Sequence, residues 1–153
     1  RAGERGDGGR RRMCIRDSRE YRSAAEAFLK AGQREPARGQ SRYAAGVAGV
    51  LEAVDASPAT WRMLLMPSQG GPPELYERLG EAREMTQAHF AAGLKAEGID
   101  GPDLANPDPE LAVRMLLAIS EQLVHLRLTD PKNYTTERLV AQAEWLFNAM
   151  FPH

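Results

Sequence analysis

Apolar side chains recur along this chain with the period of an α-helix, and one stretch has them on two opposite sides. This stretch is Asp108–Leu128, DPELAVRMLLAISEQLVHLRL. At 3.6 residues per turn, its first apolar stripe carries Leu111, Met115, Ile119, Leu123 and Leu126, and its second carries Val113, Leu117, Val124 and Leu128, with Leu116 at one edge. A helix that is apolar on two sides needs burial on both. We therefore expect the chain's own core on one side and a protein partner on the other.

A membrane is the other environment that would bury such a helix. The stretch is about 21 residues long, which is just enough to cross a bilayer. However, Arg114, Glu121 and Arg127 lie within it, and charged side chains are costly inside a membrane. We predict no membrane partner.

Other segments also combine helical periodicity with recognisable boundaries. The first is Tyr21–Ala31, which ends before Gly32, and the second is Ser41–Asp55, which follows a polar linker. A short helix starts at Ser57-Pro58, and a long helix begins at Pro73 and closes near Gly98. The last helix is capped by Thr135 or Thr136. No segment has the alternation and turn residues of a β-hairpin, and no internal repeat occurs. The prediction is an all-α fold, an antiparallel bundle of about six helices whose last two long helices form a dimerisation surface.

Residues 1–20 differ in composition from the rest of the chain. They contain seven Arg against four acidic residues, are rich in Gly and show no periodicity. This composition is typical of a disordered tail, and because the chain begins at Arg rather than Met we also expect an artefact or a fragment. The alternative is a basic arm that binds nucleic acid. Residues 21–153 are expected to form one helical domain.

Overall composition is that of a globular protein. The 153 residues are 42% hydrophobic and 27% charged, with a net charge of −1, which does not indicate a nucleic-acid surface. Cys14 is the only cysteine, so an intrachain disulfide and a thiolate zinc site are excluded. A cytoplasmic location fits this cysteine usage and the lack of an apolar signal segment.

The residue patterns that carry enzymatic chemistry are missing. No glycine motif of the phosphate-cradling kind is present, and His89, His125 and His153 have no cysteines or carboxylates at metal spacing. Glu121 and His125 are four residues apart, unlike the Glu-x-x-His of di-iron bundles. We therefore predict no catalytic residues, no metal and no cofactor, and an enzyme on a helical bundle is disfavoured.

A small-molecule pocket is the better hypothesis. Arg83, Thr86 and His89 lie on or beside the inward face of the helix that starts at Pro73, and polar groups facing a core must find partners. Arg83 is a candidate for a ligand carboxylate, the alternative being a salt bridge. The pocket candidates are Trp61, Leu65, Tyr76, Leu79, Arg83, Thr86, His89, Phe90, Met115, Ile119 and Leu123. For each apolar candidate, plain core packing is the alternative.

Four segments in a fixed order carry a family resemblance. They are LEAVDASPATWRMLLMP, PPELYERLGEAREMTQAHFAAGL, DPELAVRMLLAISEQLVHLRLTDP and NYTTERLVAQAEWLF. In this order the chain resembles, over about residues 41–151, the C-terminal ligand-binding and dimerisation domain of TetR-family transcriptional regulators. The resemblance implies that residues 21–153 bind a small apolar or amphipathic ligand and form a homodimer through a four-helix interface.

The resemblance also implies a mechanism of repression. In the family, a filled pocket moves the N-terminal helix-turn-helix domains apart, and the dimer leaves its operator. That domain has no counterpart here, so operator DNA is expected to be bound only through a domain that this chain lacks.

Within the predicted dimer, Met115, Ile119 and Leu123 would face the chain's own core and pocket, whereas Leu117 and Val124 of the second stripe would face the partner. The interface candidates are Leu117, Val124, Leu128, Ala141, Trp145 and Ala149. The alternatives are that helices of the same chain cover these residues, and that the protein is a free-standing helical interaction module without ligand or catalytic activity. The identity of the ligand does not follow from the sequence.

Overall fold

The computed structural model is mostly helical in the part of the chain that it describes, which is residues 19, 22, 23, 26, 27, 29–31, 33–65, 73–99 and 108–152. The bounded helices are α2 (Arg42–Ala56), α3 (Pro58–Leu65), α4 (Pro73–Ala96), α5 (Pro109–Thr129) and α6 (Thr136–Met150). Helical residues also occur between 19 and 31, and no strand occurs within these ranges. The all-α prediction is therefore confirmed. The predicted tail, residues 1–20, lies outside the described residues except for Arg19.

Helix boundaries follow from local hydrogen bonds. The side chains of Ser41, Asp108 and Thr135 each accept a hydrogen bond from the backbone N–H three residues further on, which caps α2, α5 and α6. At the end of α4, Gly98 has a φ of 80°. This left-handed conformation lets the N–H of Ile99 donate to the carbonyl of Leu94, and glycine adopts it without the steric cost of a Cβ.

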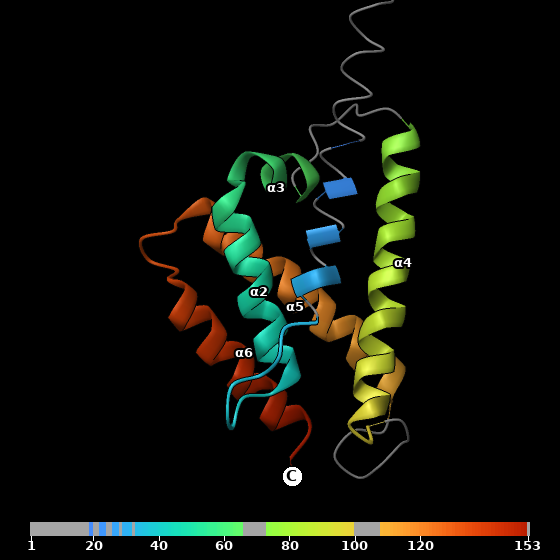
Figure 1. Ribbon diagram of the computed structural model, residues 1–153, viewed down its shortest axis with the longest axis vertical. Coiled ribbons are helices and arrows are strands. Elements are labelled where there is room, and N and C mark those ends of the chain that lie inside the picture. Colours follow the sequence, from blue (N-terminus) through green and yellow to red (C-terminus); the bar gives the residue numbers. More distant parts are fainter. Residues whose placement is uncertain are drawn as a thin grey trace, which may run out of the picture.

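The helices form a bundle around α2 (Figure 1). α2 packs on α6 and α5, α3 contacts α2 and α5, and α4 packs on α5. The long helices α4, α5 and α6 run in alternating directions, as their colours in Figure 1 show. This arrangement agrees with the predicted antiparallel bundle and leaves α5 in contact with α2 on one side and α4 on another.

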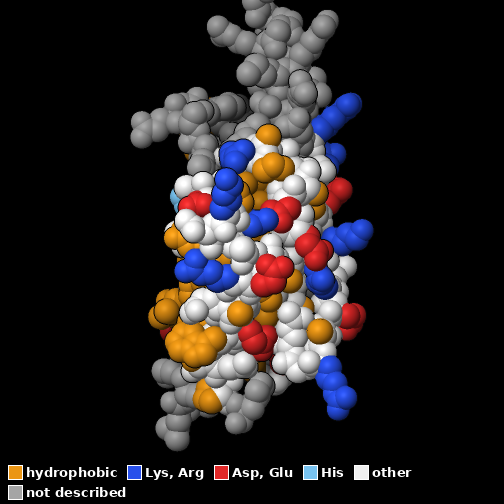
Figure 2. All heavy atoms as spheres, turned by 90° about the vertical axis from the view of Figure 1, so that its left-hand side faces the viewer, with side chains coloured by type: hydrophobic (Ala, Val, Ile, Leu, Met, Phe, Trp, Pro, Cys, Tyr) orange, Lys and Arg blue, Asp and Glu red, His pale blue; other side chains and the backbone are white. Residues whose placement is uncertain are grey.

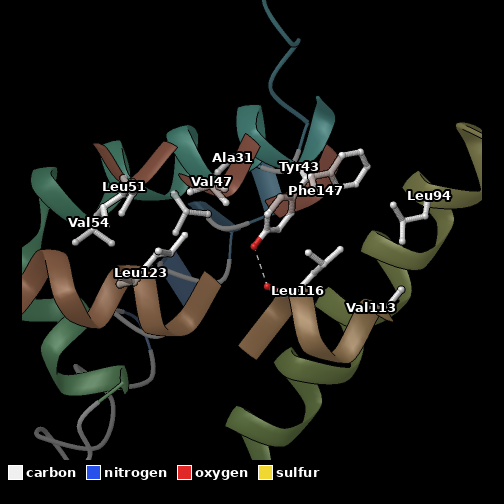
Figure 3. Packing of buried hydrophobic residues seen from close by; sticks show 14 of the residues in the cluster. Ala31, Tyr43, Val47, Leu51, Val54, Leu94, Val113, Leu116, Leu123 and Phe147 are labelled. Atoms are coloured by element: carbon white, nitrogen blue, oxygen red, sulfur yellow. Dashed lines mark hydrogen bonds between the residues drawn. The ribbon is translucent and has the colours of Figure 1, made fainter. Parts of the chain in front are cut away.

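The core lies where α2, α5 and α6 meet. Leu51 and Val54 of α2, Leu116 of α5 and Phe147 of α6 are the largest side chains that are fully buried. The ring of Tyr43 stacks on Phe147 with 5.9 Å between centroids. Figure 3 shows these side chains pointing toward one another from the three helices. Burial of this apolar surface is the main stabilising contribution to the fold.

The structure contradicts part of the predicted assignment of the two faces of α5, although Ile119 and Leu123 pack inward as expected. Val124 and Leu128, which we expected at a partner interface, are 4% and 5% exposed and belong to the chain's own core, and Leu117 packs against it. Met115, which we expected to face inward, is 49% exposed. The reason is that α2 and α4 pack against the second stripe. Helical periodicity separates two stripes but carries no information on which neighbour covers each of them.

One close contact joins the N-terminal helical residues to α2. A Cβ atom added at Gly49 would lie 3.0 Å from the Cβ and 3.1 Å from the Cα of Ala31. A glycine is therefore needed here for the two backbones to approach. This close approach offsets the roughly 1 kcal/mol that a glycine costs inside a helix relative to alanine.

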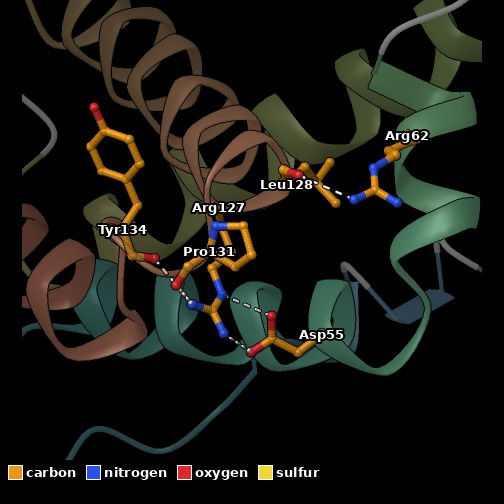
Figure 4. Close-up of polar contacts among 6 residues, drawn as sticks. All are labelled: Asp55, Arg62, Arg127, Leu128, Pro131 and Tyr134. Atoms are coloured by element: carbon orange, nitrogen blue, oxygen red, sulfur yellow. Dashed lines mark hydrogen bonds and ion pairs between the residues drawn. The ribbon is translucent and has the colours of Figure 1, made fainter.

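Arginine side chains hold the ends of several helices together (Figure 4). The guanidinium of Arg127 donates to both carboxylate oxygens of Asp55, at 2.9 and 3.0 Å, and to the carbonyls of Pro131 and Tyr134, at 2.8 and 3.1 Å. Arg62 of α3 donates to the carbonyl of Leu128 at 3.2 Å. These contacts connect α2, α3 and the turn between α5 and α6.

Candidate functional site

A cavity of about 360 Å³ lies between α2, α4 and α5. Its lining is mostly apolar, and it is formed by Gln33, Glu35, Arg42, Tyr43, Gly46, Val47, Val50, Thr86, His89, Phe90, Ala92, Gly93, Leu94, Glu97, Leu117, Ser120 and Val124. Ligand sites in proteins span roughly 300–1,000 Å³ and are mainly apolar with a few placed polar groups. Both the size and the lining therefore fit a small molecule.

Space in the cavity comes from small residues on the helices that enclose it. Gly46 of α2 and Gly93 of α4 both line it. A Cβ atom added at Gly93 meets no other atom within 4 Å. Here the absence of a side chain leaves open volume, whereas at Gly49 it permits a backbone contact. Phe90 closes one side, with its ring 5.5 Å from that of Tyr43 in an edge-to-face arrangement.

A small polar cluster occupies the wall that α2 and α5 share. The hydroxyl of Tyr43 donates to the carbonyl of Leu116 at 3.0 Å, and its oxygen lies 3.0 Å from the Oγ of Ser120. Ser120 also donates to the same carbonyl at 2.9 Å. Burial raises the pKa of the Tyr43 phenol above its ordinary value, and the hydrogen bond with Ser120 acts in the opposite direction with a smaller effect.

Exposed polar side chains surround the cavity's rim. Arg42 at the start of α2 forms an ion pair with Glu97 at the end of α4, at 3.2 Å. Glu35 and His89 are also exposed and also line the cavity. The Arg42–Glu97 pair bridges α2 and α4 on the same side as the contact between the rings of Tyr43 and Phe90.

Three of the predicted pocket residues line this cavity: Thr86, His89 and Phe90. Two residues predicted for the dimer interface, Leu117 and Val124, line it as well. Their prediction is wrong for the reason given above, since α5 turns its second stripe toward α2 and α4.

The remaining pocket candidates are not in the lining. Trp61 and Leu123 are each 6% exposed and belong to the core, and Leu65 and Ile119 pack against it, so the alternative of core packing applies to these four. Tyr76 and Met115 are 46% and 49% exposed. Arg83 forms an exposed ion pair with Glu121 at 3.2 Å, which is the salt bridge considered as its alternative role. The side chain of Leu79 lies outside the described residues.

The most informative lining residues that sequence reasoning missed are Tyr43, Ser120 and Gly93. Two of them carried a signal in the sequence, since Ser120 interrupts an apolar helix and Gly93 lowers the stability of a long one. However, the three lie on different helices, so their convergence depends on helix packing. Only the fold brings them together.

Large apolar side chains are exposed on both α5 and α6. Leu111 and Met115 of α5 are 52% and 49% exposed, and Trp145 of α6 is 63% exposed. Ala141 and Ala149 are exposed beside Trp145 on the helix. Figure 2 views the molecule from the side on which α6 lies and shows hydrophobic side chains gathered toward its left edge. The α6 residues predicted for an interface are thus accessible to a partner, whereas those of α5 are not.

Metal ligands do not gather in the described ranges. There, no three His, Cys, Asp or Glu side chains are close enough to hold a metal ion together. Within the same residues, no helix is both long and apolar enough to span a membrane. The cavity is therefore the feature of this structure that most resembles a functional site.

No protein-family model, curated protein or solved structure matches the chain. The resemblance to TetR-family regulators accordingly rests on the order of the four segments quoted above. The features of the molecule that bear on its function are the cavity and the exposed apolar side chains.

Proposed function

We propose that this chain is the ligand-sensing and homodimerisation core of a TetR-like transcriptional repressor. The observation that carries the proposal is the cavity between α2, α4 and α5, with its volume of about 360 Å³ and its mostly apolar lining. A domain whose role was only to present an outer surface would have no need of an interior space, because close packing of a core is the more stable arrangement. We propose a sensing role without catalysis, in the cytoplasm.

The position of α5 supports a link between sensing and dimerisation. Leu117, Ser120 and Val124 line the cavity from one side of this helix. Leu111 and Met115 on another side are half exposed and can face a second subunit, together with Trp145 of α6. A ligand that displaces α5 therefore changes the surface offered to the partner. In a complete regulator, this change would reach operator DNA through a helix-turn-helix domain outside this chain.

A pair of glycine variants on α4 tests the ligand-binding part of the proposal. Gly93 lines the cavity and Gly80 does not, and a Cβ at either position meets no atom within 4 Å. Both Gly93→Leu and Gly80→Leu are expected to fold, because leucine is the better helix former by roughly 1 kcal/mol. Only Gly93→Leu fills the cavity.

The measurement is a thermal-shift titration of the full chain with 2-naphthol. At about 100 times the Kd, a ligand that binds only the folded state raises the Tm of a domain of this size by about 5–10 °C. We expect this rise in the wild type and in Gly80→Leu, and its loss in Gly93→Leu. Equal shifts in all three proteins, or none in any of them, would contradict ligand binding in this cavity.

The second candidate function is a helical interaction module without a ligand. Trp145 favours it, because an indole that is 63% exposed at the surface is typical of a protein-binding site. This alternative predicts association through α5 and α6 together with no response of the Tm to 2-naphthol. The same titration therefore separates the two functions.

A further inference from the structure

The polar cluster in the cavity wall has three contacts between oxygen atoms but only two hydroxyl hydrogens to form hydrogen bonds. The hydroxyl oxygens of Tyr43 and Ser120 and the carbonyl oxygen of Leu116 lie 2.9–3.0 Å from one another. Each hydroxyl has one hydrogen and the carbonyl has none. Two hydrogens therefore serve three contacts, and both are used within the cluster. What the cluster offers to a ligand is oxygen lone pairs, which accept hydrogen bonds.

Ser120 is the member of this cluster that a ligand can reach. Its side chain is partly exposed, whereas Tyr43 is 3% exposed and is enclosed by the rings of Phe90 and Phe147. The apolar wall continues from Ser120 to Leu117 and Val124 on the same helix. A ligand in this position would place its apolar part on that wall and its polar group at the Oγ of Ser120.

Charges around the cavity act against an anionic ligand. Among the described lining residues, the carboxylates are Glu35 and Glu97, and the only Lys or Arg is Arg42. Arg42 is already paired with Glu97 at 3.2 Å. Arg83, the residue that the sequence suggested for a carboxylate, is paired with Glu121 outside the lining. An anion would thus lose its hydration without gaining an unpaired Lys or Arg among these lining residues.

From these contacts we propose that the cavity selects an apolar molecule with one hydrogen-bond donor, which donates to the Oγ of Ser120, and that it rejects carboxylates. This inference rests on the proposed ligand-binding function and names the chemical class of the ligand.

Three probes with the same ring system test it on the full chain by isothermal titration calorimetry. They are 2-naphthol, which has a donor; 2-methoxynaphthalene, which has none; and 2-naphthoate, which is an anion. One neutral hydrogen bond corresponds to about a fivefold difference in Kd. We expect 2-naphthol to bind about fivefold more tightly than the ether and at least tenfold more tightly than the carboxylate.

Two hydroxyl variants of α5 assign the preference to Ser120. In Ser120→Ala, the Leu116 carbonyl keeps its bond from Tyr43, and the preference for 2-naphthol over the ether should fall to twofold or less. Thr129→Ala is the matched control. The hydroxyl of Thr129 also donates to the carbonyl four residues earlier, that of His125, at 2.7 Å, but Thr129 lies at the far end of α5 and outside the cavity. This variant should keep the wild-type preference.

The outcomes separate this inference from the function on which it rests. Equal affinity of the wild type for 2-naphthol and the ether would overturn the donor preference while leaving a ligand-binding cavity. Tightest binding of 2-naphthoate would overturn the rejection of carboxylates, again while leaving a ligand-binding cavity. An unchanged preference in Ser120→Ala would overturn the role of its hydroxyl. If none of the probes binds the folded wild type, both the inference and the proposed ligand-binding function are wrong.

Discussion

Tyr43 is the residue at which the core and the cavity meet. Its ring packs against Phe147 in the core and Phe90 beside the cavity, and its hydroxyl reaches Leu116 and Ser120 across the helix interface. The ring therefore contributes apolar burial, and the hydroxyl keeps a polar atom satisfied in a nearly dry position. Because burial raises the pKa of this phenol, the residue also makes stability depend on pH.

The variant Tyr43→Phe measures this dependence. At pH 7 we expect it to lower the free energy of unfolding by about 1 kcal/mol, since Leu116 keeps its bond from Ser120. A folded-state pKa above the unfolded value near 10 means that the contribution of Tyr43 is fully present below pH 10 and is lost as pH rises further. The difference between wild type and variant should therefore shrink above pH 10.

Urea unfolding from pH 7 to 11 measures the two stabilities under the same conditions. Tyr76→Phe is the control, because Tyr76 is 46% exposed and its replacement should change stability by less than about 0.5 kcal/mol. A wild-type-to-variant difference that stays constant up to pH 11 would show that the hydroxyl of Tyr43 does not have the environment described here.

Among the structural elements, the turn between α5 and α6 depends most on a single side chain. Arg127 holds the carboxylate of Asp55 on α2 through two parallel bonds and also donates to two carbonyls of the turn. Its side chain is 19% exposed, so these bonds are partly protected from water. Bidentate pairs of this geometry are the stronger kind of ion pair. The turn, α2 and the end of α5 are therefore held as one unit.

Replacing Arg127 should weaken the connection between the turn, α2 and the end of α5. We expect Arg127→Met to lower the free energy of unfolding by about 2 kcal/mol, because it removes charge-assisted bonds from one carboxylate and two carbonyls. Arg114→Met is the matched control on the same helix. Arg114 pairs only with Glu110 in the described contacts, and both side chains are more than half exposed. Its loss should cost less than about 0.5 kcal/mol.

Chemical denaturation of the two methionine variants measures both effects. Similar losses in Arg127→Met and Arg114→Met would mean that the contacts of Arg127 contribute no more than an ordinary surface ion pair.

At the scale of the whole molecule, α5 presents apolar side chains both to the interior and to solvent. Its second stripe faces the cavity and the core, and its first stripe exposes Leu111 and Met115 to solvent. Burial within the chain accounts for most of the apolar residues in Asp108–Leu128, and the proposed partner surface would account for Leu111 and Met115. The proposed partner surface now consists of Leu111 and Met115 from this first stripe with Trp145 of α6, in place of the α5 residues that periodicity had suggested.

A pair of methionine variants tests this surface. We expect the wild type to be a dimer at micromolar concentration, and Met115→Lys to raise the dissociation constant at least tenfold, because it would bury a charge in an apolar interface. Met85→Lys is the control, since Met85 is 59% exposed on α4 and is placed on a different helix. Its dissociation constant should match that of the wild type.

Sedimentation equilibrium measures the three dissociation constants directly. A wild type that is monomeric at micromolar concentration would rule out the dimer. Equal weakening by Met115→Lys and Met85→Lys would show that the interface is not formed by the first stripe of α5.

By itself, the sequence determined the helices and the fold class of this protein. The caps at Ser41, Asp108 and Thr135 and the stop at Gly98 act through hydrogen bonds and backbone conformations within a few residues. Such local interactions can be inferred from neighbouring residues alone. Thr86, His89 and Phe90 could be grouped from the sequence because all three lie on one face of one helix, and they do line the cavity together.

Only the tertiary structure decided which residues of each stripe of α5 are buried and which residues surround the cavity. Both stripes of Asp108–Leu128 are equally apolar, so the choice between them depends on where α2 and α4 pack. Tyr43, Gly93 and Ser120 come together from three helices that are far apart in the chain. The ion pair of Arg83 also depends on helix packing, since its partner Glu121 lies 38 residues away in the sequence. Long-range packing of this kind leaves no periodic signal in the amino-acid sequence.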